Sequence, residues 1–280
     1  RSLFEELHAA VLMSATLRPF DVLESVLGLD EAVELSYGLE YPEENRETFA
    51  VDLPPLFSRN RDDPSVVSSY SDFLNDVIEH SAGNVLVFFP SYAEAERYYG
   101  ELSDETSAEL LLDEVGESAE SLRSELGGSD AKKVVLTYLW GTLTEGVDFP
   151  DDVARTAVVV GVGYPYLSER KRAVQDAYED EFRDGTGWKY AVEAPTIRKT
   201  RQALGRILRS PDDYGVRILA DARYSPSSDV SAGKYGVFDS FPEEERDEFV
   251  EVDSDKVRYA LYNFWERLGV DTEEEGIDVG

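Results

Sequence analysis

The apolar positions of the chain fall into short continuous runs, with amphipathic stretches between them. Continuous apolar runs are typical of strands buried on both faces, and apolar residues at every third or fourth position are typical of helices. The predicted strands are 11–15, 84–90, 109–112, 132–139, 154–163 and 215–221. The predicted helices are 2–10, 19–28, 67–80, 93–99, 117–126, 168–182, 188–209 (interrupted near Pro195) and 254–268.

The order of these elements predicts the fold class. Strands rich in Val, Leu and Ile alternate with helices, which indicates an α/β fold with a parallel sheet covered by helices on both faces. Residues 36–66 contain four prolines and are expected to be loop. Binding sites in such folds lie at the carboxyl ends of the strands, so the segments that follow the strands are the candidates for binding and catalytic residues.

Composition excludes several kinds of site. The 280 residues include no Cys and only two His, so the chain holds no disulfide, thiolate metal site or iron–sulfur cluster, and too few His for a His-based metal site. No apolar run approaches the ~20 residues of a membrane span, and nothing resembles a signal peptide. We therefore expect a cytoplasmic protein without membrane contacts.

The charge is strongly acidic, with 59 Asp plus Glu against 27 Lys plus Arg and a net charge of −32. Acids are spread along most of the chain, and only 7 of the basic residues are Lys. A dispersed acidic surface suits concentrated salt, where self-repulsion is screened. We predict a halophilic host. The alternative is an acidic interaction module or nucleic-acid mimic, which predicts no acid-free cationic segment.

Such a segment is present at QALGRILRS (202–210). No acid occurs from Ala194 to Pro211, and five basic residues lie between Arg198 and Arg209. If the segment is helical, Gln202, Arg206 and Arg209 form one stripe, while Leu204, Ile207 and Leu208 lie opposite and pack on the sheet. Guanidinium groups suit phosphate oxygens, whereas the simpler alternative is the solvated face of an amphipathic helix.

A second segment, LWGTLTEGVDFP (139–150), follows a predicted strand directly. Gly141 and Gly146 permit close approach of a ligand to the backbone, Thr142 offers a hydroxyl, and Glu145 and Asp148 offer carboxylates. The alternative is an ordinary strand-to-helix connection whose carboxylates cap backbone N–H groups.

Two weaker segments also follow strands. In MSATL, Ser14 and Thr16 are placed where hydroxyls bond across a domain interface. In FFPSY, Ser91 and Tyr92 lie at the mouth of the sheet, where a helix N-terminus can receive a phosphate. Helix N-capping explains Thr16 and Ser91 equally well.

Together these segments resemble the XPD/DinG group of superfamily 2 DNA helicases over roughly residues 10–225. SATL is similar to helicase motif III, FFPSY to the motif IV region, and WGTLTEGVDFP to motif V. QALGRILRSPDDYGVRILADARY resembles motif VI with its D-Y-G-V and D-x-R-[FY] tail, and GYPY (163–166) matches the segment after motif V. The resemblance implies a RecA-like sheet, a P-loop NTPase-like fold.

The departures from the family pattern define which part is present. There is no G-x-x-x-x-G-K-[ST] loop, and the DEAV at 30–33 is not an acidic box, because it follows Gly28 and comes after motif III. The four cysteines of many relatives are also missing. We predict that the chain is the second RecA-like motor domain (19–270), preceded by the end of the first domain with motif III (1–18) and followed by an acidic tail (271–280).

The resemblance implies a role for each candidate residue. In this family, motif VI arginines contact the γ-phosphate of ATP. The resemblance therefore implies that Arg209, and next to it Arg206, contacts this phosphate, and that Gln202 helps to hold the two arginines in place. The remaining assignments are Gly146, Asp148 and Glu145 for ATP binding, Ser91, Tyr92, Gly141 and Thr142 for nucleic acid, and Ser14 and Thr16 for interdomain coupling.

The same resemblance implies the partners. Single-stranded DNA and the first RecA-like domain of the same polypeptide are expected, with ATP and Mg²⁺ bound mainly through that first domain. The chain alone is expected to be inactive as an ATPase. The alternative function is a non-catalytic adaptor that keeps the fold and binds protein or nucleic acid.

Overall fold

The computed structural model describes residues 4, 7–14, 17–29, 32–37, 41–113, 119–127, 131–145, 153–182, 185–208, 210–229 and 235–270. Contacts within the chain divide it into two compact units, Arg1–Glu40 and Tyr41–Gly280. No helix of the described residues is long and apolar enough to cross a bilayer.

The first unit contains helix α2 (Phe20–Leu27). It ends at Gly28, whose φ of 63° is the left-handed conformation that glycine adopts most readily, so the predicted helix is confirmed. The strand predicted at 11–15 is wrong, because residues 11–14 lie in no strand and Val11 and Met13 are 81% and 86% exposed. Residues 7–10 are likewise not helical. The functional boundary predicted at residue 18 stays a prediction.

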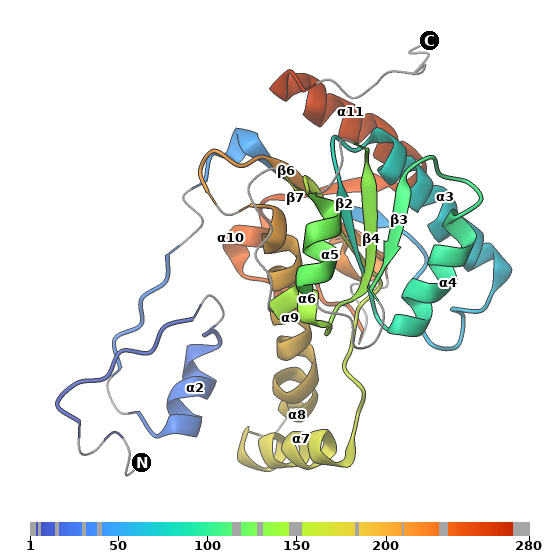
Figure 1. The fold of residues 1–280 in the computed structure, drawn as a ribbon. Coiled ribbons are helices and arrows are strands. Elements are labelled where there is room, and N and C mark those ends of the chain that lie inside the picture. The colour runs from blue at the N-terminus through green and yellow to red at the C-terminus, as the bar shows by residue number, and fades with distance from the viewer. Residues whose placement is uncertain are drawn as a thin grey trace. The chain divides into compact units, whose positions relative to one another are not determined.

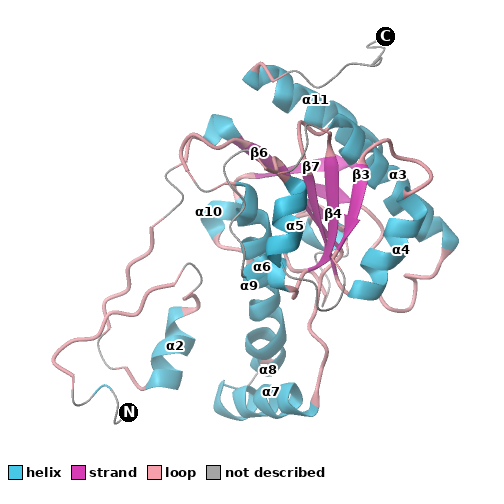
Figure 2. Ribbon diagram, in the orientation of Figure 1, coloured by secondary structure: helices cyan, strands magenta, loops and turns pink. Residues whose placement is uncertain are grey.

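The second unit is built on one parallel sheet, shown in magenta in Figure 2. All its strand pairs are parallel, and the strand order is β3-β4-β2-β5-β6-β1-β7. The strands are β1 (Arg46–Asp52), β2 (Val85–Phe89), β3 (Glu109–Leu112), β4 (Lys133–Tyr138), β5 (Thr156–Val160), β6 (Gly215–Ala220) and β7 (Phe249–Asp253).

Helices cover both faces of this sheet, as predicted (Figure 1). One face packs against α3 (Pro64–His80), α4 (Tyr92–Leu102) and α11 (Val257–Leu268). The other packs against α5 (Ala119–Leu126), α6 (Thr142–Glu145) and α9 (Ala194–Leu204). The remaining helices are α7 (Glu169–Phe182), α8 (Thr186–Trp188) and α10 (Glu243–Arg246).

Two strands occur where the sequence pattern predicted none. β1 lies inside the proline-containing stretch expected to be loop, and its interior residues are buried. Pro42 lies before the 3₁₀ turn that leads into β1, and Pro54 lies after β1, so the prolines bound the strand instead of breaking it. β7 is an edge strand with exposed and acidic positions, and therefore lacks a continuous apolar run.

The long helical segment predicted at 188–209 is divided into several turns. A π-helical turn at Lys189–Glu193 leads into α9, where Pro195 occupies the first turn and needs no intrahelical donor. After Leu204 the chain tightens into a 3₁₀ turn over Gly205–Ile207, and Leu208 is extended. The predicted helix is therefore correct only in its first part.

Candidate functional site

Four predicted site residues lie where β2 and β4 end. Phe89 and Tyr138 are register partners, and the Leu139 N–H continues the ladder by donating to the Phe89 carbonyl at 2.9 Å. The segments 90–92 and 139–142 therefore leave the sheet at the same edge. This arrangement places Tyr92 beside Gly141, as expected for segments that follow neighbouring parallel strands.

Gly141 lies in a tightly packed turn. Its N–H donates to the Tyr138 carbonyl at 2.8 Å. A Cβ at this position would lie 2.9 Å from the Tyr138 carbonyl oxygen, 3.3 Å from a carboxylate oxygen of Asp113 and 3.4 Å from the Tyr92 hydroxyl. The protein's own groups thus fill the space beside this glycine, and Tyr92 reaches the turn after β4.

The sequence did not reveal Asp113, which directly follows β3 and is buried. Its carboxylate accepts a hydrogen bond from the Thr137 hydroxyl at 2.6 Å. Burial raises the pKa of Tyr92, and the negative charge of Asp113 adds to this effect. Tyr92 is therefore a neutral phenol at physiological pH, stacked obliquely on Tyr138 with ring centroids 5.0 Å apart.

Ser91 begins α4. Its hydroxyl accepts a hydrogen bond from the Glu94 N–H at 3.2 Å, which confirms the predicted N-cap. Thr142 is the first residue of α6 and is exposed. The Ser91 hydroxyl is thus used for capping, while the Thr142 side chain is exposed to solvent.

Arg206 lies against the turn that follows β4. Its guanidinium Nη2 donates a hydrogen bond to the Thr144 carbonyl in α6. The neighbouring Leu204, Ile207 and Leu208 are buried against the sheet, as predicted. The 3₁₀ turn and the extended Leu208 replace the predicted α-helical stripe, so Arg206 is placed by the aliphatic residues around it and not by helical spacing.

Gln202 occupies the last turn of α9 and is half-buried. Its side-chain oxygen is buried and accepts no hydrogen bond from the described residues. Gly205 follows, and a Cβ there would meet nothing within 4 Å. The surface beside Gln202 is therefore open at Gly205, as the sequence suggested.

Several predicted residues lie outside the described residues. These are Arg209, Gly146, Asp148 and Thr16, together with the side chain of Glu145, the last residue of α6. Ser14 is described and lies in the exposed part of the first unit.

A buried ion pair joins the end of β6 to the segment after β1. Asp221 accepts hydrogen bonds from Arg223 Nε at 2.8 Å and Nη2 at 2.6 Å, and from the Leu56 N–H at 2.9 Å. Burial works against the charge of Arg223, but the bonds to Asp221 leave its pKa above the ordinary value. Both residues belong to the D-x-R-[FY] pattern noted in the sequence. Their hydrogen bonds hold the segment after β6 against the segment after β1, at the carboxyl edge of the sheet.

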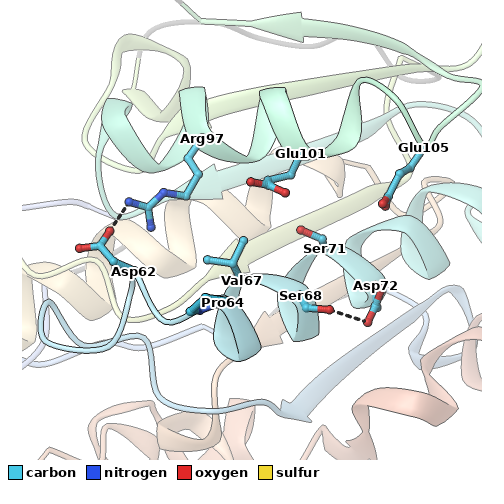
Figure 3. A pocket seen from close by; sticks show the side chains of 9 residues that line it. All are labelled: Asp62, Pro64, Val67, Ser68, Ser71, Asp72, Arg97, Glu101 and Glu105. Carbon is cyan, nitrogen blue, oxygen red and sulfur yellow. Dashed lines mark hydrogen bonds and ion pairs between the residues drawn. The ribbon is translucent and has the colours of Figure 1, made fainter.

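Two other clusters lie on the face covered by α3 and α4. Asp76, Glu79 and His80 of α3 have ligand atoms within 4.8 Å of one another. A groove of about 460 Å³ between α3 and α4 is lined by Asp62, Asp72, Glu101 and Glu105, with the Arg97 guanidinium bound to Asp62 (Figure 3). This groove repels phosphate, and the opposite face carries Arg206.

Comparison with known proteins agrees with this geometry. The family model for the helicase C-terminal domain matches residues 74–232. The helicase subunit XPD of the general transcription and DNA repair factor IIH from Schizosaccharomyces pombe is 27% identical over 81% of this chain and 32% of its own length. The corresponding XPD/RAD3 subunit from Saccharomyces cerevisiae is 28% identical over 80% of this chain and 31% of its own length. This chain thus spans about a third of these relatives.

The fold is also shared with solved structures. An XPD helicase structure has a TM-score of 0.65 with 20% sequence identity, and covers 86% of this chain and 42% of its own chain. The predicted RecA-like fold is confirmed, and so is the resemblance to XPD-type helicases. Because the family model matches more than half of the sequence, the chain belongs to the helicase C-terminal domain family.

Proposed function

We propose that this chain is the second motor domain of an ATP-dependent DNA helicase, working with a first RecA-like domain of the same polypeptide. The observation that carries the proposal is the contact between Arg206 and Thr144, which joins the motif VI segment to the turn after β4. The relatives named above are helicase subunits of a DNA repair factor, so DNA repair is part of the proposal.

Arginines of this domain would act on ATP held by the first domain. Arg209 is the proposed finger and Arg206 its neighbour, and both would stabilise the charge that develops on the γ-phosphate in the transition state. Gln202 supports this role because its side-chain oxygen is buried beside the open surface at Gly205. Gly146, Asp148 and Glu145 would order the segment that touches the nucleotide.

The Mg²⁺ that accompanies ATP would be held by the first domain. The Asp76 cluster does not fit this role, because it lies on the face of α3 and Arg206 lies on the other face of the sheet. This chain's part is therefore to supply cations and to exclude water when the two domains close around the triphosphate.

Single-stranded DNA would run past the ends of β2 and β4. Tyr92 and Thr142 would offer hydroxyls there, Ser91 and Gly141 would shape the turns that carry them, and none of these contacts would read base edges. Ser14 and Thr16 would couple the two motor domains as they open and close.

ATP hydrolysis by the polypeptide that joins this chain to its first motor domain tests the proposal. We expect DNA-stimulated hydrolysis from the joined protein and none from this chain alone. Arg209→Ala should lower kcat by about 10³-fold or more with little change in nucleotide affinity, as for an arginine finger.

Arg258→Ala, on the exposed surface of α11, is the matched control and should leave kcat unchanged. Unchanged turnover in both Arg209→Ala and Arg206→Ala would contradict the catalytic role and favour an adaptor.

A further inference from the structure

We infer that the beginning of α7 forms a contact surface for the sugar–phosphate backbone of single-stranded DNA. The surface, called here the α7 patch, consists of Trp140, Tyr166, Arg170, Lys171 and Arg172. The inference rests on the proposed function. Arg170, Lys171 and Arg172 lie outside the motif segments and the ATP site, whereas Trp140 and Tyr166 belong to the motif V segment and to GYPY but have no role assigned above.

The first observation is a run of cations without ion-pair partners. Arg170, Lys171 and Arg172 are consecutive, and no carboxylate within the described ranges forms an ion pair with any of them. By contrast, Arg97 and Arg201 are held by Asp62 and Glu245. In a chain with 59 acids, three adjacent cations left unneutralised indicate an external anion.

The second observation is the direction of charge along α7. Glu169 begins α7, and Arg170, Lys171 and Arg172 follow it in the first turn, where the helix macrodipole is positive; Glu179, Asp180 and Glu181 occupy the last turn, where it is negative. Both placements oppose the dipole. Glu179 has a structural use, because it accepts hydrogen bonds from the Gly185 and Gly187 N–H groups at 2.9 Å. Among the described residues, the side chains of Arg170 and Arg172 have no such internal partner.

The third observation ties the patch to the predicted nucleic-acid edge. Trp140 immediately precedes Gly141, and its indole N–H donates to the Gly163 carbonyl at 2.8 Å, which fixes the ring between two loops. The Lys171 ammonium lies 5.0 Å from the centroid of this ring. A cation–π contact therefore places the Lys171 charge beside the turn that follows β4.

The fourth observation is an exposed aromatic ring on the loop that leads into α7. Tyr166 is 85% exposed, and α7 begins three residues later, with the hydroxyl of the preceding Ser168 accepting from the Lys171 N–H at 3.3 Å. A row of cations beside an exposed aromatic ring is the combination that binds single strands without sequence preference, through phosphate contacts and base stacking.

Binding of a fluorescein-labelled oligo(dT) to the 280-residue chain, followed by anisotropy at several salt concentrations, tests the charges. The variant Arg170→Gln/Arg172→Gln removes two phosphate contacts. We expect Kd to rise about tenfold or more at 0.1 M salt, and the slope of log K against log salt to fall by about 1.4.

The control variant Arg258→Gln/Arg267→Gln makes the same chemical change on α11, at the opposite end of the second unit (Figure 1). We expect its Kd to stay within about twofold of the wild-type value and its salt slope to be unchanged. Equal effects of the two double variants would overturn the inference, because bulk charge would then explain binding.

Tyr166 is tested by two substitutions. Tyr166→Ala should raise Kd at least about fivefold without changing the salt slope, and Tyr166→Phe should bind like the wild type, because stacking needs only the ring. Thermal unfolding checks that every variant folds. Wild-type binding that persists in all α7-patch variants would overturn this inference alone, whereas a wild-type chain that fails to bind the oligonucleotide would overturn the proposed DNA contact as well.

Discussion

At the scale of single residues, Gly141 illustrates how a motif glycine acts in this fold. Its missing side chain leaves room for the Tyr138 carbonyl, which lies too close for a Cβ, and for the Asp113 carboxylate, which would be in tight contact with one. We expect Gly141→Ala to lower the free energy of unfolding by about 1–3 kcal/mol, since the backbone and a buried carboxylate must shift. Urea denaturation of the chain measures this difference.

Gly100 provides the matched control in α4, because a Cβ there would meet nothing within 4 Å. Gly100→Ala should raise the free energy of unfolding by about 0.5–1 kcal/mol, as expected for alanine in a helix interior. Destabilisation of similar size at both glycines would show that the packing around Gly141 is not the cause.

The residue scale also shows where the sequence pattern stopped being informative. The aliphatic residues of QALGRILRS are buried as predicted, because apolar side chains must pack on the sheet whatever the turn. The placement of Arg206 did not follow from helical spacing, since α9 ends at Leu204. Asp113 was missed because a lone acid after a short strand carries no local pattern; only the fold brings it to Gly141.

At the scale of elements, burial explains why the interior strands were visible in the sequence. The interior strands β2, β4, β5 and β6 are almost wholly buried and appear as continuous apolar runs. β1 contains charged residues at both ends, and β7 is an exposed edge. Such strands depend on long-range pairing, which a local pattern does not record.

Glu248 links β6, β1 and β7, the last three strands in the order of the sheet. Its carboxylate accepts hydrogen bonds from Arg46, which begins β1, at 2.6 and 3.1 Å, and from Arg217 of β6 at 2.8 Å, and it directly precedes β7. Partial burial works to raise the pKa of Glu248, but the bonds and charges of the two arginines leave it below its ordinary value.

Because this pKa is lowered in the folded state, Glu248 stabilises the fold above the unfolded-state pKa of about 4.3 and loses that effect as pH falls through the folded pKa. Glu248→Gln should lower the free energy of unfolding by about 1–3 kcal/mol at pH 7, and the difference from wild type should shrink below about pH 4. Glu243→Gln, an exposed residue of α10, is the control for urea titrations across this range and should show little change. A difference that is constant with pH would contradict the role of the ion pairs.

At the scale of the whole molecule, the net charge of −32 sets a condition for stability. Ion pairs such as Arg97–Asp62 and Arg246–Asp239 neutralise only part of the acidic surface, so carboxylates repel one another across the folded chain. Unfolding relieves this repulsion by spacing the charges apart. The same surface repels DNA, so the proposed contact depends on the cations of the α7 patch that form no ion pair.

Salt should therefore stabilise the fold. Raising KCl from 0.1 M to 1 M shortens the Debye length from about 10 Å to about 3 Å, and we expect Tm to rise by about 5 °C or more, with the rise continuing above 0.15 M. Differential scanning calorimetry measures this rise. Choline chloride screens charge as KCl does, so similar increases in the two salts indicate screening, whereas an increase confined to KCl indicates specific ion binding. A Tm that does not change between 0.1 M and 1 M would contradict the halophilic interpretation. It would mean that repulsion between the dispersed acids does not destabilise the folded state.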